Sequence, residues 1–225
     1  MSCYHHIIRD KDDLSFIYYE RDIYIESEKK NLWDWLKNMK GFIGGDVNGK
    51  KVSRRQKWCH IDNYYFEPSW KNRFKRWESQ QYDNTLFTLQ TQIQYKINEI
   101  HDNLPDNVRC HVEKPVFNSV LLNHYKNGDN IITKHSDNQN VFGISPTIAI
   151  LSIGGPRTLK FTRKVYNPEN IRTIKVDHEN MDRNIDVVME SGSLLIMAGM
   201  TQRYFLHSID KENNANERYS ITFRE

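Results

Sequence analysis

Apolar residues recur at intervals of three and four along residues 86–104, and this spacing predicts an amphipathic helix that packs on a sheet. The apolar positions are Leu86, Leu89, Ile93, Ile97, Ile100 and Leu104, after which Pro105 ends the pattern. A second helix is expected over about residues 28–39, with Ser27 as its N-cap and Gly41 near its end. The first half of the chain therefore reads as mixed, with at least two helices.

After Pro115 the pattern changes to short β-type runs separated by turn residues. Strands are expected over residues 116–125, 147–153, 158–163, 186–189, 193–197, 204–208 and 218–223. A series of short strands with turns between them is typical of an antiparallel sandwich or barrel. The expected fold class is therefore mainly β with N-terminal helices (α+β), built on a jelly roll.

Composition indicates a globular chain with a core of its own. Of 225 residues, 38% are hydrophobic and 27% charged, so disorder is not expected. We expect a single domain over 1–225, in which about 1–115 supply helices and a lid and about 116–225 the jelly roll. No apolar run of about 18 residues occurs, so neither a membrane span nor a secretory signal is expected. We expect an intracellular monomer, nuclear or cytoplasmic.

The cysteines restrict the chemistry of any metal site. Cys3, Cys59 and Cys110 are odd in number and far apart, which argues against disulfides and against a thiolate zinc site. Metal ligands must then come from histidines and carboxylates.

Positive charge is concentrated in residues 50–76. Nine basic residues against Asp62 and Glu67 give this segment a local charge of 9 − 2 = +7, whereas the whole chain carries +3. The same segment contains the rings of Trp58, Tyr64, Tyr65, Phe66, Trp70 and Phe74. Cations that meet phosphates, mixed with rings that stack on bases, suit a nucleic-acid surface, and residues around 64–66 suggest a hairpin or lid. The alternative is a solvated basic loop with a few core aromatics.

A candidate metal site lies in the second half of the chain. In an extended segment, the side chains of His135 and Asp137 share one face and can bind one ion. The same triplet occurs at His60 and Asp62, so spacing alone does not choose between them. His207 follows an apolar run and offers a third ligand to the first pair. Two histidines and one carboxylate are the ligand set with which non-haem iron(II) oxygenases leave positions open for cosubstrate and oxygen.

An arginine on the last strand can bind an acidic cosubstrate. The guanidinium of Arg218 can form two parallel hydrogen bonds with a carboxylate. Ser220, Thr222 and Arg224 lie on the same face of the strand, because alternate residues of a strand point to the same side. Six extended residues separate the two arginine Cα atoms by roughly 20 Å, so geometry alone favours Arg218. A zinc hydrolase also uses two histidines and an aspartate, but it has no need of these arginines.

Two further polar residues, Asn123 and Tyr125, share a face of the first expected core strand. Their amide and phenol groups can line the same pocket. If each residue is considered on its own, the simpler interpretation is an ordinary half-buried strand residue.

Taken together and in order, these segments resemble the AlkB family of iron(II)- and 2-oxoglutarate-dependent dioxygenases over about residues 116–225. The resemblance rests on Asn123-His124-Tyr125-Lys126-Asn127-Gly128, His135-Ser136-Asp137, Ser145-Pro146-Thr147-Ile148-Ala149, Gly192-Ser193-Leu194-Leu195-Ile196-Met197, His207-Ser208 and Arg218-Tyr219-Ser220-Ile221-Thr222-Phe223-Arg224. It implies a double-stranded β-helix core and a catalytic iron held by His135, Asp137 and His207. It also implies a cosubstrate site of Asn123, Tyr125, Arg218, Ser220 and Arg224, where Ser220 replaces a common Asn.

Upstream, residues 52–58 resemble the Pro-Arg segment of the nucleotide-recognition lid in the vertebrate-type DNA repair branch of that family. The resemblance implies that Arg54 contacts substrate. Relatives usually follow this segment with Tyr-Gly, whereas this chain has Cys59-His60. The aromatic contact to an extruded base is therefore expected from Trp58 or from residues 64–66.

Three more positions enter the expected substrate site. Gln139 stands two residues after Asp137, where relatives often have an acidic residue that reads the base edge, so an altered base preference is expected. Arg157 and Arg163 follow a glycine-rich turn and are expected to contact phosphates. Ordinary surface charge is the alternative for both arginines.

The resemblance implies oxidative demethylation of N-alkylated bases, such as 1-methyladenine and 3-methylcytosine, in DNA or RNA. The reaction uses Fe(II), 2-oxoglutarate and O2, releases formaldehyde and succinate, and requires a single-stranded or flipped-out base. One alternative is an oxygenase of the same fold that acts on a protein or a small molecule, which leaves the basic segment unexplained. The other alternative is a nucleic-acid-binding relative that has lost catalysis. The complete set of expected metal ligands and arginines argues against it.

Overall fold

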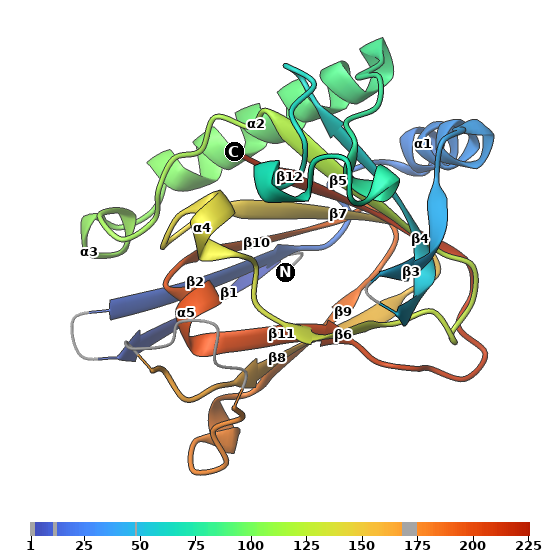
Figure 1. The fold of residues 1–225 in the computed structure, drawn as a ribbon. Coiled ribbons are helices and arrows are strands. Elements are labelled where there is room, and N and C mark those ends of the chain that lie inside the picture. Colours follow the sequence, from blue (N-terminus) through green and yellow to red (C-terminus); the bar gives the residue numbers. More distant parts are fainter. Residues whose placement is uncertain (1–2, 11–12, 48, 168–174) are drawn as a thin grey trace.

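The chain folds into two antiparallel β-sheets that face each other (Figure 1). The structure, a computed structural model, describes residues 3–10, 13–47, 49–167 and 175–225. The larger sheet has the order β1 (Cys3–Asp10), β2 (Asp13–Glu20), β10 (Ser193–Gly199), β7 (Ile148–Gly154), β12 (Arg218–Arg224), β5 (Ser119–Tyr125), β4 (Lys50–His60) and β3 (Ile43–Val47). The smaller sheet has the order β6 (Ile132–His135), β11 (Phe205–Ile209), β8 (Arg157–Arg163) and β9 (Ile185–Met189).

Apolar side chains from both sheets meet in one buried cluster. Ile150 and Met197 of the larger sheet pack there with Phe161 and Phe205 of the smaller one. Two facing antiparallel sheets of this kind are a jelly roll. The predicted fold class is confirmed.

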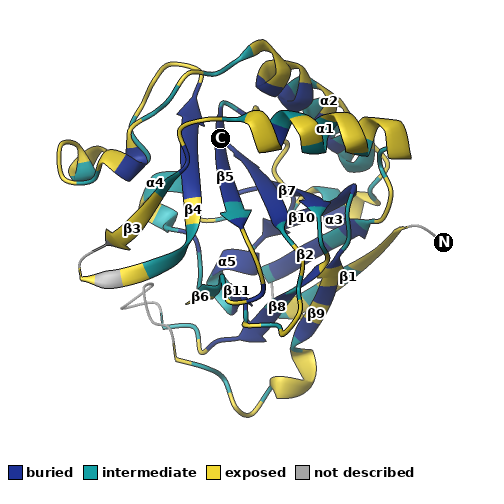
Figure 2. Ribbon diagram, turned by 90° about the vertical axis from the view of Figure 1, so that its right-hand side faces the viewer, coloured by how far each residue is buried: buried dark blue, intermediate teal, exposed yellow. Residues whose placement is uncertain are grey.

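Two helices cover the outer face of the larger sheet. Helix α1 (Glu26–Asn38) and helix α2 (Asn84–Asp102) contribute Leu36, Leu86 and Ile93 to a second buried cluster with strand residues such as Ile221. Figure 2 shows β5, β7 and β10 largely buried beneath these helices, whose outer surfaces are exposed. The apolar stripe predicted for α2 therefore packs on a sheet, as expected.

The helix boundaries differ slightly from the prediction. The N-cap of α1 is Ile25, not Ser27, because the Glu28 carboxylate accepts a hydrogen bond from the Ile25 N–H at 3.0 Å. Helix α2 begins after Asp83, whose carboxylate accepts from the Leu86 N–H at 2.8 Å. Shorter helical turns are η1 (Pro68–Trp70), η2 (Lys75–Trp77), α3 (Asp106–Arg109), α4 (Gln139–Phe142), η3 (Met181–Arg183) and α5 (Thr201–Tyr204).

All seven strands expected after residue 115 are present, and β6 is added to them. The first 60 residues contain more strand than expected: β1 and β2 extend the larger sheet at one edge, and β3 and β4 at the other. Strand β4 pairs with β5 from Arg55↔His124 to His60↔Ser119, so the basic segment starts inside the sheet rather than as a separate lid. Residues 64–66 form no strand. The boundary between parts 1–115 and 116–225 stays a prediction.

Strand β12 divides its side chains between two environments, as its parity predicts. Tyr219, Ile221 and Phe223 pack in the cluster under the helices. The alternate residues from Arg218 to Arg224 face the space between the sheets. No helix in the described part of the chain is long and apolar enough to cross a membrane.

Candidate metal centre and cosubstrate cavity

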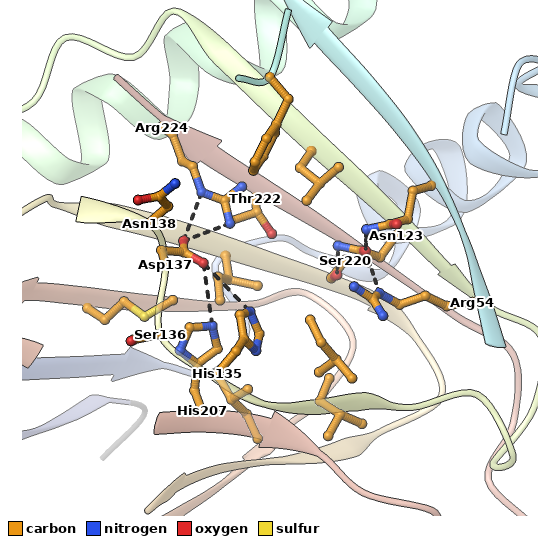
Figure 3. A pocket seen from close by; sticks show the side chains of 18 of the residues that line it. Arg54, Asn123, His135, Ser136, Asp137, Asn138, His207, Ser220, Thr222 and Arg224 are labelled. Atoms are coloured by element: carbon orange, nitrogen blue, oxygen red, sulfur yellow. Dashed lines mark hydrogen bonds and ion pairs between the residues drawn. The ribbon is translucent and has the colours of Figure 1, made fainter. Parts of the chain in front are cut away.

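One pair of strands places two histidines side by side. Strands β6 and β11 are antiparallel neighbours in which His135 is directly opposite His207, with ring centroids 4.2 Å apart. Asp137 follows β6, and its Oδ1 lies 3.7 Å from His135 Nε2 and 3.9 Å from His207 Nε2. The three side chains point toward one another (Figure 3), and their possible ligand atoms all lie within 4.8 Å of one another. This geometry suits a single metal ion.

The competing His-x-Asp triplet gathers no third ligand among the described residues. His60 is buried, and its Nδ1 accepts a hydrogen bond from the Asp62 N–H at 3.0 Å. The second triplet thus forms a local turn.

The segment that carries the ligands is held by three hydrogen bonds. The carbonyl oxygen of Thr133 lies 2.9 Å from His135 Nδ1, so this nitrogen carries the proton and Nε2 offers its lone pair to a metal. Gln202 Oε1 accepts from the Asp137 N–H at 2.8 Å, and Lys164 Nζ donates to Ser136 Oγ at 2.8 Å. Gln202 and Lys164 are buried. Neither was identified from the sequence, because the partners lie 65 and 28 residues away.

Arg224 holds the carboxylate ligand. Its Nε and Nη2 donate to Asp137 Oδ2 at 3.0 and 2.9 Å, which leaves Oδ1 directed at the two histidines (Figure 3). Burial raises the pKa of Asp137, but the charges of Arg224 and the histidines outweigh it and lower that pKa to about 2. Burial also lowers the pKa of His135, and it lowers that of His207 to about 3. At neutral pH the ligands thus have the protonation states that a metal requires.

A cavity of about 280 Å³ adjoins the three ligands. All residues predicted for the metal and cosubstrate sites line it, namely Asn123, Tyr125, His135, Asp137, His207, Arg218, Ser220 and Arg224. Strands β5, β6, β11 and β12 supply these side chains, except Asp137, which follows β6. The strands can do so because alternate residues of each strand face the same space.

Arg218 offers a buried positive charge to an acidic ligand. Its side chain is 1% exposed, Nε donates to Ser152 Oγ at 2.9 Å, and the guanidinium lies 5.1 Å from the ring centroid of Tyr125. Among the described residues, Nη1 has no hydrogen-bond partner and no carboxylate lies within ion-pair distance of Arg218. Burying an unpaired charge is costly, so the carboxylate of a small diacid such as 2-oxoglutarate fits here.

Asn123 connects the cavity to the basic segment. Its Oδ1 accepts from Arg54 Nε at 2.9 Å and from Gln56 Nε2 at 3.0 Å, and its Nδ2 donates to Ser220 Oγ at 3.4 Å. Gln56 Oε1 in turn accepts from Arg76 Nη1 at 3.3 Å. Arg54 therefore lines the cavity, as expected for a substrate residue. Its guanidinium is directed at Asn123. Gln56 was missed by sequence reasoning.

The aromatic wall of the cavity agrees with the prediction in part. Trp58 is 2% exposed, and its Nε1 donates to the carbonyl oxygen of Tyr64 at 2.9 Å, so it is not among the residues that line this cavity. The rings of Phe66, Trp70 and Trp77 line it instead. The expectation that Trp58 stacks on a base in this cavity is wrong, because its ring packs against its neighbours, whereas the alternative, residues 64–66, supplies Phe66.

The expected phosphate contacts of two arginines are also wrong. Arg157 is fully buried and donates to the carbonyl oxygens of Asn127 at 3.3 Å and Asn130 at 3.0 Å. Arg163 is buried and paired with Asp10 through Nη1 at 2.8 Å. Both guanidinium groups stabilise the fold and cannot reach a polymer outside it.

Gln139 does not line the cavity, whereas its neighbour Asn138 does. Gln139 begins α4, and Asn138 caps that helix by accepting from the Asn140 N–H at 3.0 Å. The base-reading role expected of Gln139 stays a prediction.

The basic segment divides into inward and outward charges. Arg54 and Arg76 point inward, and Lys57 is buried with Nζ donating to the carbonyl oxygen of Lys40 at 3.2 Å. The exposed basic side chains described in the segment are Lys51, Arg55, Lys71, Arg73 and Lys75. Its outer charge is thus smaller than the sequence suggests.

A sequence model described as "2OG-Fe(II) oxygenase superfamily" matches residues 44–224, which include every ligand of the proposed centre. The chain belongs to the 2OG-Fe(II) oxygenase superfamily. Members of this superfamily use Fe(II), 2-oxoglutarate and O2. The His-Asp-His group and the buried Arg218 fit these requirements.

Among curated relatives, this oxygenase is similar to the human "Alpha-ketoglutarate-dependent dioxygenase alkB homolog 3", with 37% identity over 109 residues, 48% of this chain and 36% of that one. It is also similar to the Arabidopsis thaliana "DNA oxidative demethylase ALKBH2", with 32% identity over 120 residues, 48% of this chain and 37% of that one. The matches span about a third of each relative. They confirm the AlkB resemblance found in the sequence.

Solved structures support the fold. The structure of OsALKBH1 has a TM-score of 0.63 at 14% identity and covers 93% of this oxygenase and 97% of that chain. A Pseudomonas putida prolyl-4-hydroxylase has a TM-score of 0.51 at 12% identity and covers 93% and 92%. At these identities the likeness concerns the fold alone.

Proposed function

We propose that this oxygenase is an oxidative demethylase of N-alkylated bases, such as 1-methyladenine and 3-methylcytosine, in DNA or RNA. The observation that carries the proposal is the aromatic wall of Phe66, Trp70 and Trp77, in the same cavity as the metal ligands. Flat aromatic side chains stack on any base and so can hold one beside the metal. The printed names of the AlkB relatives support the same reaction class.

In this proposal each polar residue of the cavity has a role. His135, Asp137 and His207 hold Fe(II), which when bound supplies the oxidation of 2-oxoglutarate and of the N-methyl group by O2. Arg218 pairs with a carboxylate of 2-oxoglutarate, Tyr125 packs against Arg218, and Arg224 keeps Asp137 ionised and oriented. Asn123 is held by Arg54, Gln56 and Ser220 at the same side of the cavity.

The substrate must be single-stranded or flipped out, because the methyl group of these lesions occupies the edge that pairs with the other strand. Unstacking costs a few kcal/mol, and stacking on the aromatic wall offsets that cost. Lys71, Arg73 and Lys75 are exposed on the same segment as the wall and would meet the phosphates.

The test uses matched oligonucleotides that carry 1-methyladenine or 3-methylcytosine, made as DNA and as RNA. Mass spectrometry after incubation with Fe(II) and 2-oxoglutarate should show loss of the methyl group with the wild type and none with His135→Ala. Methyl groups that persist while succinate forms would instead indicate an oxygenase that acts on a protein or a small molecule. Failure to bind iron would indicate a nucleic-acid-binding relative without catalysis. A monomeric state and a nuclear or cytoplasmic location remain predictions.

A further inference from the structure

A second cavity, of about 390 Å³, adjoins the first and shares the side chain of Phe66 with it. It lies between the segment that follows β4 and helix α4, and its lining includes Trp58, His60, Tyr64 and Phe142. None of the roles assigned above to the metal or 2-oxoglutarate uses this cavity.

Six of the thirteen residues that line the second cavity carry aromatic rings, and several of these rings pack against one another. Trp58 is almost fully buried and packs edge-on against Phe66, with ring centroids 5.0 Å apart. Phe142 also meets Phe66 edge-on, at 5.4 Å. Tyr64 stands at the rim, 64% exposed, with its ring 4.8 Å from that of His60. Rings held in this way offer a fixed surface on which a flat ligand can stack.

Two polar groups narrow the choice of ligand. Asn118 lines the cavity, and its Oδ1 is buried without a hydrogen-bond partner among the described residues, so it favours a ligand with an N–H donor. Lys71 lines the rim as an exposed cation that can meet a phosphate. The carboxylate of Glu225 also lies in the lining, where its Oε2 accepts from the Val116 N–H at 3.1 Å.

A flat ring, an N–H donor and a phosphate together describe a nucleotide. We propose that the second cavity binds the unmodified nucleobase next to the target base in the same strand, an inference that rests on the proposed function. Phe66, which lines both cavities, then stands between two consecutive bases and keeps them unstacked, as apolar wedges do in other nucleic-acid complexes. The Asn118 oxygen accepts from the amino group of a neighbouring adenine, cytosine or guanine.

The experiment measures the dissociation constant of fluorescent single strands that carry 1-methyladenine. In one set both neighbours are adenine, and in two others the 5′ or the 3′ neighbour is an abasic spacer. For the wild type, the spacer on one side should weaken binding by roughly tenfold, because one stacked base is lost. Tyr64→Ala should weaken binding of the all-base strand and should remove most of the difference between base and spacer.

Two further variants keep the test specific. Asn118→Leu, similar in size to the native residue, should reduce the effect of the spacer in the same direction. Tyr95→Ala removes a 72% exposed ring of α2 that lines neither cavity and should behave as wild type. The proposal is overturned if neither spacer weakens binding, or if Tyr64→Ala weakens binding of all strands equally. Binding is measured separately from methyl removal, so failure of the demethylase proposal would appear only in the latter.

Discussion

Arg224 donates two hydrogen bonds to a single oxygen of Asp137, at 3.0 and 2.9 Å, and leaves the other oxygen to the histidines. The AlkB resemblance implies that Arg224 binds 2-oxoglutarate. In the structure its Nε and Nη2 hold a metal ligand, and its Nη1 has no hydrogen-bond partner among the described residues. This contact is worth testing because groups that hold a ligand from behind tune the affinity of the metal.

Arg224→Lys should therefore weaken metal binding. A lysine keeps the charge but loses the planar fork, and loss of such a supporting partner typically costs 10- to 100-fold in metal affinity. Titration with Mn²⁺, which resists oxidation better than Fe(II), measures the change. Unchanged metal affinity with a raised KM for 2-oxoglutarate would show instead that Arg224 serves the cosubstrate directly.

Arg218→Lys should give the opposite result. Arg218 makes no contact with a metal ligand, and its Nη1 is available to a carboxylate. A hydrogen bond to a charged group contributes about 1.5–3 kcal/mol, so the KM for 2-oxoglutarate should rise by roughly 10-fold or more. Metal affinity should stay at the wild-type value. A variant that loses metal affinity as well, at an unchanged melting temperature, would contradict the separation of the two arginines.

Gln202→Leu should affect the metal centre beyond its effect on stability. The substitution leaves the buried Asp137 N–H without its acceptor, which should cost about 1–3 kcal/mol of unfolding free energy and misplace the carboxylate. We expect weaker Mn²⁺ binding, measured by the same titration.

Gln90→Leu is the matched control, because Gln90 is also buried and donates to a backbone carbonyl, that of Phe117, at 2.9 Å. It should lose comparable stability and retain metal affinity. Equal metal affinities in the two variants would show that Gln202 has only a structural role.

Metal affinity should change little between pH 8 and pH 6. Protons compete with a metal only below the pKa of each ligand, and burial lowers the pKa of His207 to about 3 and also lowers that of His135. Two histidines with ordinary pKa values near 6.5 would lose roughly tenfold or more in affinity over this range. Mn²⁺ titration at several pH values therefore distinguishes the two cases, and the affinity should fall only at more acid pH.

Much of the site could be predicted because it depends on alternation along strands. Arg218, Ser220 and Arg224 face one space since β12 is extended, and β6 and β11 bring His135 and His207 together through simple antiparallel pairing. These local rules need no knowledge of distant contacts.

The errors concern contacts between distant residues. Arginine is usually a surface residue, but Arg157 is buried and donates hydrogen bonds to backbone carbonyl oxygens 30 and 27 residues away along the chain. The edge strand β1 was missed because its polar residues, such as His5 and His6, show no clear alternation and pair only with β2. Trp58 lies on β4, which was expected to be a lid, so its burial followed from an unpredicted pairing with β5.

The most direct test of the central claim is the ratio of formaldehyde to succinate released from a single strand carrying 1-methyladenine or 3-methylcytosine, with Fe(II), 2-oxoglutarate and O2. The wild type should release the two products in about equal amounts, because each methyl group removed consumes one 2-oxoglutarate. His135→Ala should release neither. Succinate without formaldehyde from the wild type, on DNA and RNA alike, would contradict the demethylase account.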